Sequence, residues 1–251
     1  MDDFMGSLDF FSIRYGNYFL PKNSEKDIVC RDIRNDKIFD SQIVAELKNI
    51  YISRGDSDAI ILDVGANFGQ MSILFSSFPQ LLGEDTERSK PKALVYSFEA
   101  EPYVSKVLAL NIAANRLTEK IKVIDKAVWC KDGQQISFPS PDSLTMDSWS
   151  SYGLDPDDQH GRMVDSVTID SFNFSGPIAF MKVDTQGSDL SALKGAKSTI
   201  QKWRMPIIFE YEEMFSSKFK AGLDDYLNFV QEINYCVTKV IANNYLIESR
   251  V

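Results

Sequence analysis

The sequence feature that most constrains the fold is a short apolar run that ends in a glycine-bearing turn before a helical segment. Residues 59–64 read Ala-Ile-Ile-Leu-Asp-Val, and residues 65–70 read Gly-Ala-Asn-Phe-Gly-Gln. Such an apolar run is typical of a central parallel strand that is buried on both faces. Gly65 permits a sharp turn, and Gly69 permits the helix to approach the strand and a ligand closely. A ligand that crosses this turn would meet backbone N–H groups at the helix N-terminus.

The chain beyond this turn alternates between strand-like and helix-like segments. Further strands are predicted over residues 93–98, 121–125, 178–183 and 206–210, and helices over residues 70–78, 103–115, 190–203 and 223–233. This alternation predicts an α/β, Rossmann-like fold with a doubly wound, mostly parallel sheet and helices on both faces. Residues 235–241 and 245–249 flank Asn243 and Asn244, which predicts a C-terminal antiparallel hairpin.

The chain is interpreted as a single domain, residues 56–251, with an N-terminal cap, residues 1–55, packed on its core. Residues 41–52 follow the helical period and predict a helix within this cap. The charged residues 79–92 predict a solvated loop, and Lys-Asp-Gly at residues 131–133 predicts a hairpin turn.

A polar segment at residues 139–164 is longer than a simple connection between two strands. Long loops in compact domains are often functional, so a functional role is expected for this segment. It contains Trp149, Tyr152, Met146 and Met163. These side chains form either a lid over a site or a small satellite core under the loop. The sequence leaves both interpretations open.

The charge balance argues against a nucleic-acid groove or an anionic membrane as the main partner. The chain has 27 basic and 36 acidic residues, a net charge of −9, and no cluster of Lys and Arg. Cys30, Cys130 and Cys236 are far apart, so they predict neither a zinc site nor a disulfide framework. No signal peptide and no apolar stretch of about 18 residues is present, so no membrane span is expected and the protein is predicted to be cytoplasmic. The oligomeric state is not indicated.

The turn and two strand ends carry residues suited to a nucleoside. The G-x-x-x-G spacing puts Asn67 where a pyrophosphate would need a glycine, which favours a nucleoside without a diphosphate. Glu99 follows a strand, where an acid can accept both ribose hydroxyls, while Glu101 fits better as a helix-entry acid. Asp125 ends the next strand, and it either receives the exocyclic amine of adenine or only terminates the strand.

Asp184 and His160 are the candidates for a catalytic base. Asp184 lies at the carboxyl end of a predicted central strand, where open α/β sheets place functional groups. It could accept a proton, orient a nucleophile or only hydrogen-bond the following turn. Histidine is the residue type best suited to proton transfer near neutral pH, and His160, the single histidine, lies in the long polar segment. Lys182 is expected to pair with a carboxylate such as Glu210 on the neighbouring strand.

Several runs together resemble the FkbM-like family of class I S-adenosylmethionine-dependent methyltransferases. They are LDVGANFGQ at 62–70, FEAEP at 98–102, the strand end at 125–127, VTID at 167–170, MKVDTQGSDLSALKGA at 181–196 and IIFE at 207–210. The resemblance implies a seven-stranded sheet with a reversed last strand, S-adenosylmethionine as cofactor, and O-methylation of a sugar, glycan or polyketide-like hydroxyl. The cofactor-binding residues that it implies are Asp63, Gly65, Asn67, Gly69, Glu99, Ala100, Asp125 and Ala127. The first 50 residues match the family only loosely, and we expect the N-terminal segment to form a cap over the acceptor side.

Two alternatives compete with this function. A nicotinamide-dependent oxidoreductase would be expected to carry the third fingerprint glycine and a Tyr-x-x-x-Lys pair, and the sequence has neither in the expected place. A noncatalytic nucleotide-binding module is the other alternative. It gains weight from Gln186, because members of the family commonly have glutamate there. No residues show dedicated metal-ligand spacing, so no metal is expected.

Overall fold

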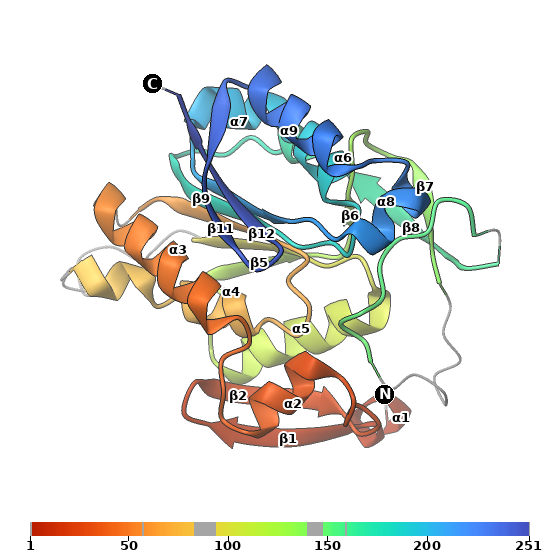
Figure 1. Ribbon diagram of the computed structural model, residues 1–251. Coiled ribbons are helices and arrows are strands. Elements are labelled where there is room, and N and C mark those ends of the chain that lie inside the picture. The colour runs from red at the N-terminus through yellow and green to blue at the C-terminus, as the bar shows by residue number, and fades with distance from the viewer. Residues whose placement is uncertain (1, 57, 83–93, 140–147, 159, 251) are drawn as a thin grey trace.

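The computed structural model describes residues 2–56, 58–82, 94–139, 148–158 and 160–250, and its centre is a seven-stranded sheet (Figure 1). The strand order is β11-β12-β10-β9-β3-β4-β5. The strands are β3 Ile60–Val64, β4 Val95–Phe98, β5 Ile121–Ile124, β9 Ile178–Val183, β10 Ile207–Glu210, β11 Tyr235–Ile241 and β12 Asn244–Ser249. Neighbouring strands pair in parallel except at β12, which is antiparallel to β10 and β11. The predicted α/β fold with its C-terminal hairpin is confirmed.

Helices cover both faces of this sheet, because its central strands are apolar on both sides (Figure 1). One layer contains α3 Ser41–Arg54, α4 Gln70–Phe75 and α5 Pro102–Ala114, and the other contains α6 Asp189–Lys194, α7 Lys197–Trp203 and α9 Leu223–Glu232. Alternate residues of a strand enter different cores. Ile61 of β3 packs in the core on the α3 side, and Leu62 packs in the core on the α9 side.

The N-terminal segment forms a small layer of its own against α5. It contains α1 Asp2–Gly6, β1 Leu8–Ile13, β2 Gly16–Pro21 and α2 Ile28–Arg34, and it is followed by α3, the helix that the sequence predicts. The buried Asn111 of α5 accepts from Phe19 N at 2.6 Å and donates to Phe68 O at 2.9 Å. Asn115 accepts from Asn17 N at 2.8 Å. These side chains pair with β2 as a neighbouring strand would, and Asn111 also ties β2 to the glycine turn.

Two predicted helices differ from the structure, one of them at a close approach of the backbone. The helix predicted over residues 190–203 is split into α6 and α7 at Gly195, where a Cβ would lie 2.0 Å from the carbonyl oxygen of Trp129. The helix predicted over residues 70–78 ends at Phe75, and the 3-10 helix η1 Phe78–Leu82 follows. Residues 79–82 of the loop predicted over residues 79–92 belong to η1, and residues 83–92 lie outside the described residues.

The hairpin predicted around residues 131–133 is wrong. β6 Ala127–Val128 and β7 Gln135–Phe138 both pair with β8 Arg162–Val167, β6 in parallel and β7 antiparallel. The three strands form a second sheet in the order β6-β8-β7, so the turn joins two strands that flank a third. Short elements complete the chain: η2 Ile169–Ser171, η3 Glu213–Phe215 and α8 Ser216–Phe219. No helix in the described part of the chain is long and apolar enough to cross a membrane.

Candidate functional site

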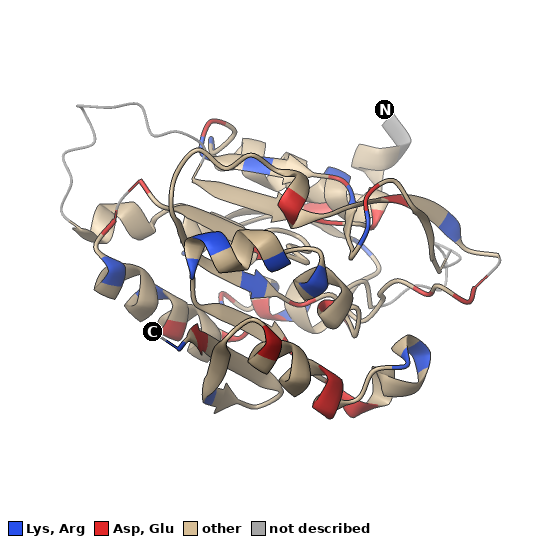
Figure 2. Cartoon of the chain, turned by 90° about the horizontal axis from the view of Figure 1, so that it is seen from above, with Lys and Arg blue, Asp and Glu red and all other residues tan. Residues whose placement is uncertain are grey.

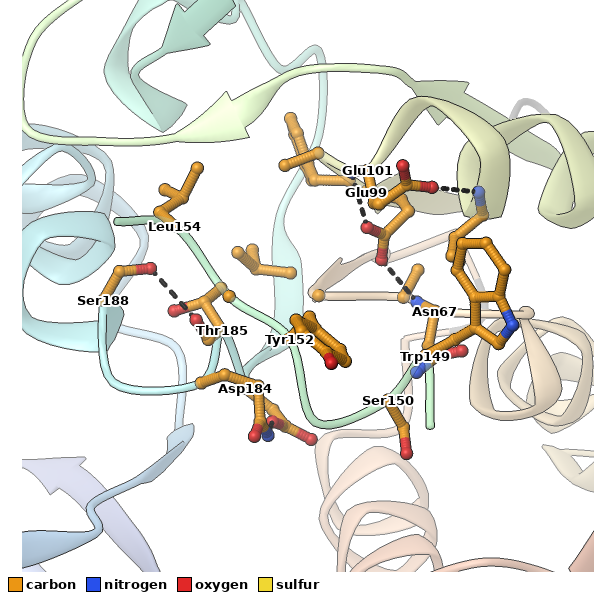
Figure 3. A pocket seen from close by; sticks show the side chains of 18 of the residues that line it. Asn67, Glu99, Glu101, Trp149, Ser150, Tyr152, Leu154, Asp184, Thr185 and Ser188 are labelled. Carbon is orange, nitrogen blue, oxygen red and sulfur yellow. Dashed lines mark hydrogen bonds between the residues drawn. The ribbon is translucent and has the colours of Figure 1, made fainter. Parts of the chain in front are cut away.

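A pocket of about 250 Å³ opens at the carboxyl ends of β3 and β9 (Figure 3). These two strands are neighbours, but the chain continues from β3 to β4 on one side and from β9 to β10 on the other. Such a reversal of strand order leaves a crevice beyond the strand ends, where open α/β sheets bind their ligands. The sheet topology therefore puts the pocket at the position expected for a ligand site.

The glycine turn forms one wall of the pocket, and its sequence follows from close packing. Gly65 has a φ of +80°, and a Cβ there would lie 1.7 Å from the carbonyl oxygen of Asp184. Gly69 has a φ of +86°, and a Cβ there would lie 2.4 Å from Cδ1 of Leu108. Asn67, between them, adopts the left-handed conformation with a φ of +50°. The turn thus depends on glycine for its backbone angles and for the close approach of β9 and α5.

Glu99 is held against the glycine turn by two backbone hydrogen bonds (Figure 3). Its Oε2 accepts from Asn67 N at 2.8 Å, and its Oε1 accepts from Glu101 N at 2.9 Å. Burial raises the pKa of Glu99 to about 7, and the two backbone bonds oppose this rise. Each oxygen keeps a lone pair for a further donor. The carboxylate can therefore accept two adjacent hydroxyl groups of a ligand in the pocket.

Glu101 has a structural role, as a helix-entry acid should. Its Oε2 accepts from Val104 N at 2.6 Å and caps α5, and its Oε1 forms an ion pair with Arg162. The N-terminus of a helix favours such a carboxylate because unpaired N–H groups and the macrodipole converge there.

The other predicted cofactor residues are only partly brought together. Ala100 and Ala127 line the pocket, together with apolar Phe98, Val128, Phe138 and Leu154. Asp63 is fully buried beneath the turn, where its Oδ2 accepts from Ser72 Oγ at 2.5 Å. Asp125 is exposed and borders a separate recess next to Met163 and Asp165. The structure therefore supports a slot for a flat apolar ring at Ala127, without a contribution from Asp125.

A buried polar cluster lies on the opposite wall. Lys182 Nζ donates to Asp184 Oδ2 at 3.0 Å, so the expected ion pair with a carboxylate forms with Asp184 and not with Glu210. Burial alone would raise the pKa of Asp184, but the Lys182 ammonium outweighs it and lowers that pKa. Burial also disfavours the charged form of Lys182, yet Asp184 and Asp63 raise its pKa. The pair is thus ionised, and Asp184 presents its carboxylate at the pocket wall.

His160, the other predicted base, lies away from the pocket. Its side chain is exposed, and its backbone N–H donates to Asp158 Oδ1 at 2.8 Å in a surface turn. Trp149 and Tyr152 of the same long segment do line the pocket, as a lid would (Figure 3). Trp149 stacks on Tyr103 of α5 with ring centroids 4.5 Å apart. Met163 is exposed on β8, and Met146 lies outside the described residues.

The sequence analysis missed the residues that fasten the N-terminal segment and the long segment to the pocket. Buried Asp27 caps α2 through Cys30 N at 2.8 Å and also accepts from Ser150 N at 2.7 Å. Gln70 bonds to Phe39 N and Lys37 O at 2.9 and 2.8 Å, and Phe39 lines the pocket. Asp27 precedes an apolar helical run, a visible cap signal, whereas its second bond spans 123 residues. Among the described residues, no group of three or more His, Cys, Asp or Glu could hold a metal ion.

The sheet order and the pocket at its reversal point define a Rossmann-like fold of the kind found in methyltransferases. The family of methyltransferase FkbM domains matches residues 63–237, and the chain belongs to this family. No curated protein matches the chain.

Among solved structures, the chain is similar to methyltransferase FkbM from Methylobacillus flagellatus KT, with 18% identity and a TM-score of 0.48. That match covers 76% of this chain and 44% of the other, so the chain spans less than half the length of that protein. A precorrin-6y C5,15-methyltransferase from Geobacter metallireducens GS-15 matches with 13% identity and a TM-score of 0.43, over 84% of this chain and 89% of that one.

Proposed function

We propose that this chain is an S-adenosylmethionine-dependent methyltransferase that methylates a hydroxyl oxygen of a sugar, a glycan or a polyketide-like small molecule. The observation that supports it most is Glu99, a carboxylate with two free acceptor positions that is fixed to the glycine turn at the pocket wall. Membership of the methyltransferase FkbM domain family supports the reaction class.

The pocket residues fit the cofactor. Glu99 would hold the two ribose hydroxyls, and the turn from Gly65 to Asn67 would lie along the amino-acid arm. The apolar slot at Ala127 and Leu154 would take the adenine ring. S-adenosylmethionine would supply a methyl group on a positively charged sulfur, which is already a strong electrophile. The main contribution of the protein is then alignment, which can lower the barrier by roughly 7–11 kcal/mol.

Asp184 is the proposed acceptor of the hydroxyl proton. It lies at the pocket wall at the end of β9 and is ionised because of Lys182. A hydroxyl becomes strongly acidic as its oxygen gains the methyl group, so even a weakly basic carboxylate can take the proton at that stage. A placed base of this kind contributes about 10²–10⁴-fold to a rate.

The charges around the pocket favour an acceptor without phosphate groups. Lys126 and Lys182 are the basic residues among the described lining residues, and they pair with Asp165 at 3.4 Å and Asp184 at 3.0 Å. Elsewhere, Lys and Arg are scattered over many elements and do not follow one face (Figure 2). Nucleic-acid binding depends on a face of the protein on which Lys and Arg are concentrated. We therefore propose a small-molecule or glycan acceptor and no nucleic acid.

Calorimetry and a transfer assay test the proposal together. S-adenosylhomocysteine should bind and NADH should not, which would separate a methyltransferase from an oxidoreductase. In a transfer assay with a tritiated methyl group and a panel of glycans, small alcohols and RNA, the glycans or the small alcohols should be labelled and the RNA should not. Cofactor binding without transfer to any member of the panel would favour a noncatalytic module, and labelled RNA would refute the proposed acceptor class.

The three cysteines are unpaired, so a reducing compartment such as the cytoplasm is the proposed location.

A further inference from the structure

Two carboxyl groups lie side by side at the end of the pocket that the cofactor residues do not use. Asp184 directly follows β9, Glu210 is the last residue of the neighbouring strand β10, and both line the pocket. Nε2 of Gln186 lies 3.1 Å from Asp184 Oδ1 and 3.4 Å from Glu210 Oε2, so the two carboxyl groups are close neighbours. Two ionised carboxylates held this close repel each other, which favours one proton on the pair.

The surrounding charges decide which carboxyl group carries the proton. Lys182 donates to Asp184 and keeps it ionised. Glu210 loses hydration and faces other acids, namely Asp184, Asp189 of α6 and Glu212, which together raise its pKa to about 9 despite Lys182. On the other elements packed against the pair, the acids are Asp63 of β3 and Asp40, just before α3; the pKa of each is raised, mainly by burial.

Gln186 clamps the two carboxyl groups from the turn after β9. Its Nε2 lies 3.1 Å from Asp184 Oδ1 and 3.4 Å from Glu210 Oε2, so one amide group donates to both. The backbone of Gln186 is left-handed, with a φ of +53°. Gly153 of the long segment packs directly on it, since a Cβ on Gly153 would lie 2.8 Å from Cβ of Gln186. Gln186 is therefore held by its hydrogen bonds to the two carboxyl groups and by the close packing of Gly153.

We propose that Glu210 and Gln186 are positioning residues for Asp184, with Glu210 as a neutral carboxylic acid that shares its proton with the Asp184 carboxylate. The inference rests on the proposed methyl transfer in the same pocket. Three donors, on Lys182, Gln186 and Glu210, then fix the orientation of Asp184 and leave an oxygen lone pair for the acceptor hydroxyl. Asp184 takes the hydroxyl proton while the oxygen–methyl bond forms and the sulfur–methyl bond breaks. The electron pair stays on sulfur, and the proton passes on to water.

A neutral Glu210 also sets the charge of the acceptor floor. The charges of Lys182 and Asp184 cancel, so the group formed by Lys182, Asp184 and Glu210 carries no net charge as long as Glu210 is protonated. Ionisation of Glu210 would place a second negative charge beside Asp184 and remove one of its donors. Activity should therefore fall on the alkaline side as Glu210 loses its proton.

Carboxyl NMR tests the proposal directly on the full chain saturated with S-adenosylhomocysteine. With ¹³C-labelled glutamate, one carboxyl signal should titrate near pH 9 and should be absent in Glu210→Gln. In Gln186→Glu, which replaces the amide with a third carboxylate, that midpoint should move upward by about one unit or more. Exposed Glu119→Gln is the matched control and should leave the titration unchanged.

Activity on an acceptor found in the transfer screen provides a second readout. Glu210→Gln keeps a donor beside Asp184, whereas Glu210→Leu removes it, so kcat should be at least about tenfold higher in the amide variant. The alkaline fall of kcat should be missing in Glu210→Gln. A residue needed only for packing would give equal kcat values and an unchanged pH profile.

Failure of this inference is distinguishable from failure of the proposed function. If the wild-type protein does not bind S-adenosylhomocysteine, the proposed function fails. If it binds the compound but no glutamate titrates near pH 9, only the shared proton is refuted. A signal near pH 9 that survives in Glu210→Gln would also overturn the proposal.

Discussion

Replacement of Gly65 by alanine separates the two reasons for a glycine at this turn. An alanine in the left-handed region costs about 1–2 kcal/mol. At Gly65 the new methyl group would also lie 1.7 Å from the carbonyl oxygen of Asp184, a backbone atom that cannot rotate away. Overpacking of this kind adds typically about 1–3 kcal/mol. Gly65→Ala should therefore lose roughly 2–5 kcal/mol of unfolding free energy.

Gly133→Ala is the matched control for this change. Gly133 has a φ of +68°, but nothing lies within 4 Å of a Cβ at this position. It should lose only the conformational part, about 1–2 kcal/mol. For a chain of this size, 1 kcal/mol corresponds to about 2–4 °C in Tm, so urea or thermal unfolding resolves the difference. Equal destabilisation of the two variants would refute the close approach of β9 to the turn.

Three further predictions concern the cofactor wall, the N-terminal layer and a buried acid. Glu99→Gln should weaken S-adenosylhomocysteine binding by about tenfold or more, because a hydrogen bond to a charged group contributes about 1.5–3 kcal/mol. The pKa of Glu99 is about 7, and an ionised carboxylate accepts hydrogen bonds from the ribose hydroxyls more strongly than a neutral one. The affinity of the wild-type protein for S-adenosylhomocysteine, measured by calorimetry, should therefore rise from about pH 6 to 8. A flat pH profile would contradict the ribose contact. Asn111→Ala leaves Phe19 N and Phe68 O unpaired, so urea unfolding should show a loss of about 1–3 kcal/mol for each buried group, and a change within error would count against the docking of β2. Burial and Asp184 raise the pKa of Asp189 from 3.8 to about 7, so the folded state binds an extra proton between these values and stability should fall as pH rises through this window. Asp189→Asn should flatten that part of the stability profile, and an identical profile in the variant would exclude Asp189 as its origin.

The sequence predicted the parts of the fold that depend on neighbouring residues. β3, the glycine turn and the start of α4 form one continuous signal of apolar strand, flexible turn and helix, and the structure confirms it. The acids Glu99 and Asp184 were found for the same reason, since each directly follows an apolar strand whose end reaches the pocket.

The remaining features depend on contacts between distant residues. β6 pairs Ala127 with Ser166 of β8, and the two residues of β6 are too few to show a pattern of their own. Asp125 follows β5 as Glu99 follows β4, yet it borders a different recess, because the end of a strand does not specify which way the next side chain points. His160 lies in a segment without periodicity, so its exposed position could not be read from the sequence. The clamp by Gln186 likewise depends on the pairing of β9 with β10.

The most direct test of the central claim is a crystal structure with S-adenosylhomocysteine. Both ribose hydroxyls should lie within hydrogen-bonding distance of Glu99, the amino-acid arm should follow the turn from Gly65 to Asn67, and the sulfur should face the space in front of Asp184. A nucleoside bound in the recess beside Asp125, or with its ribose away from Glu99, would contradict the proposed methyl transfer.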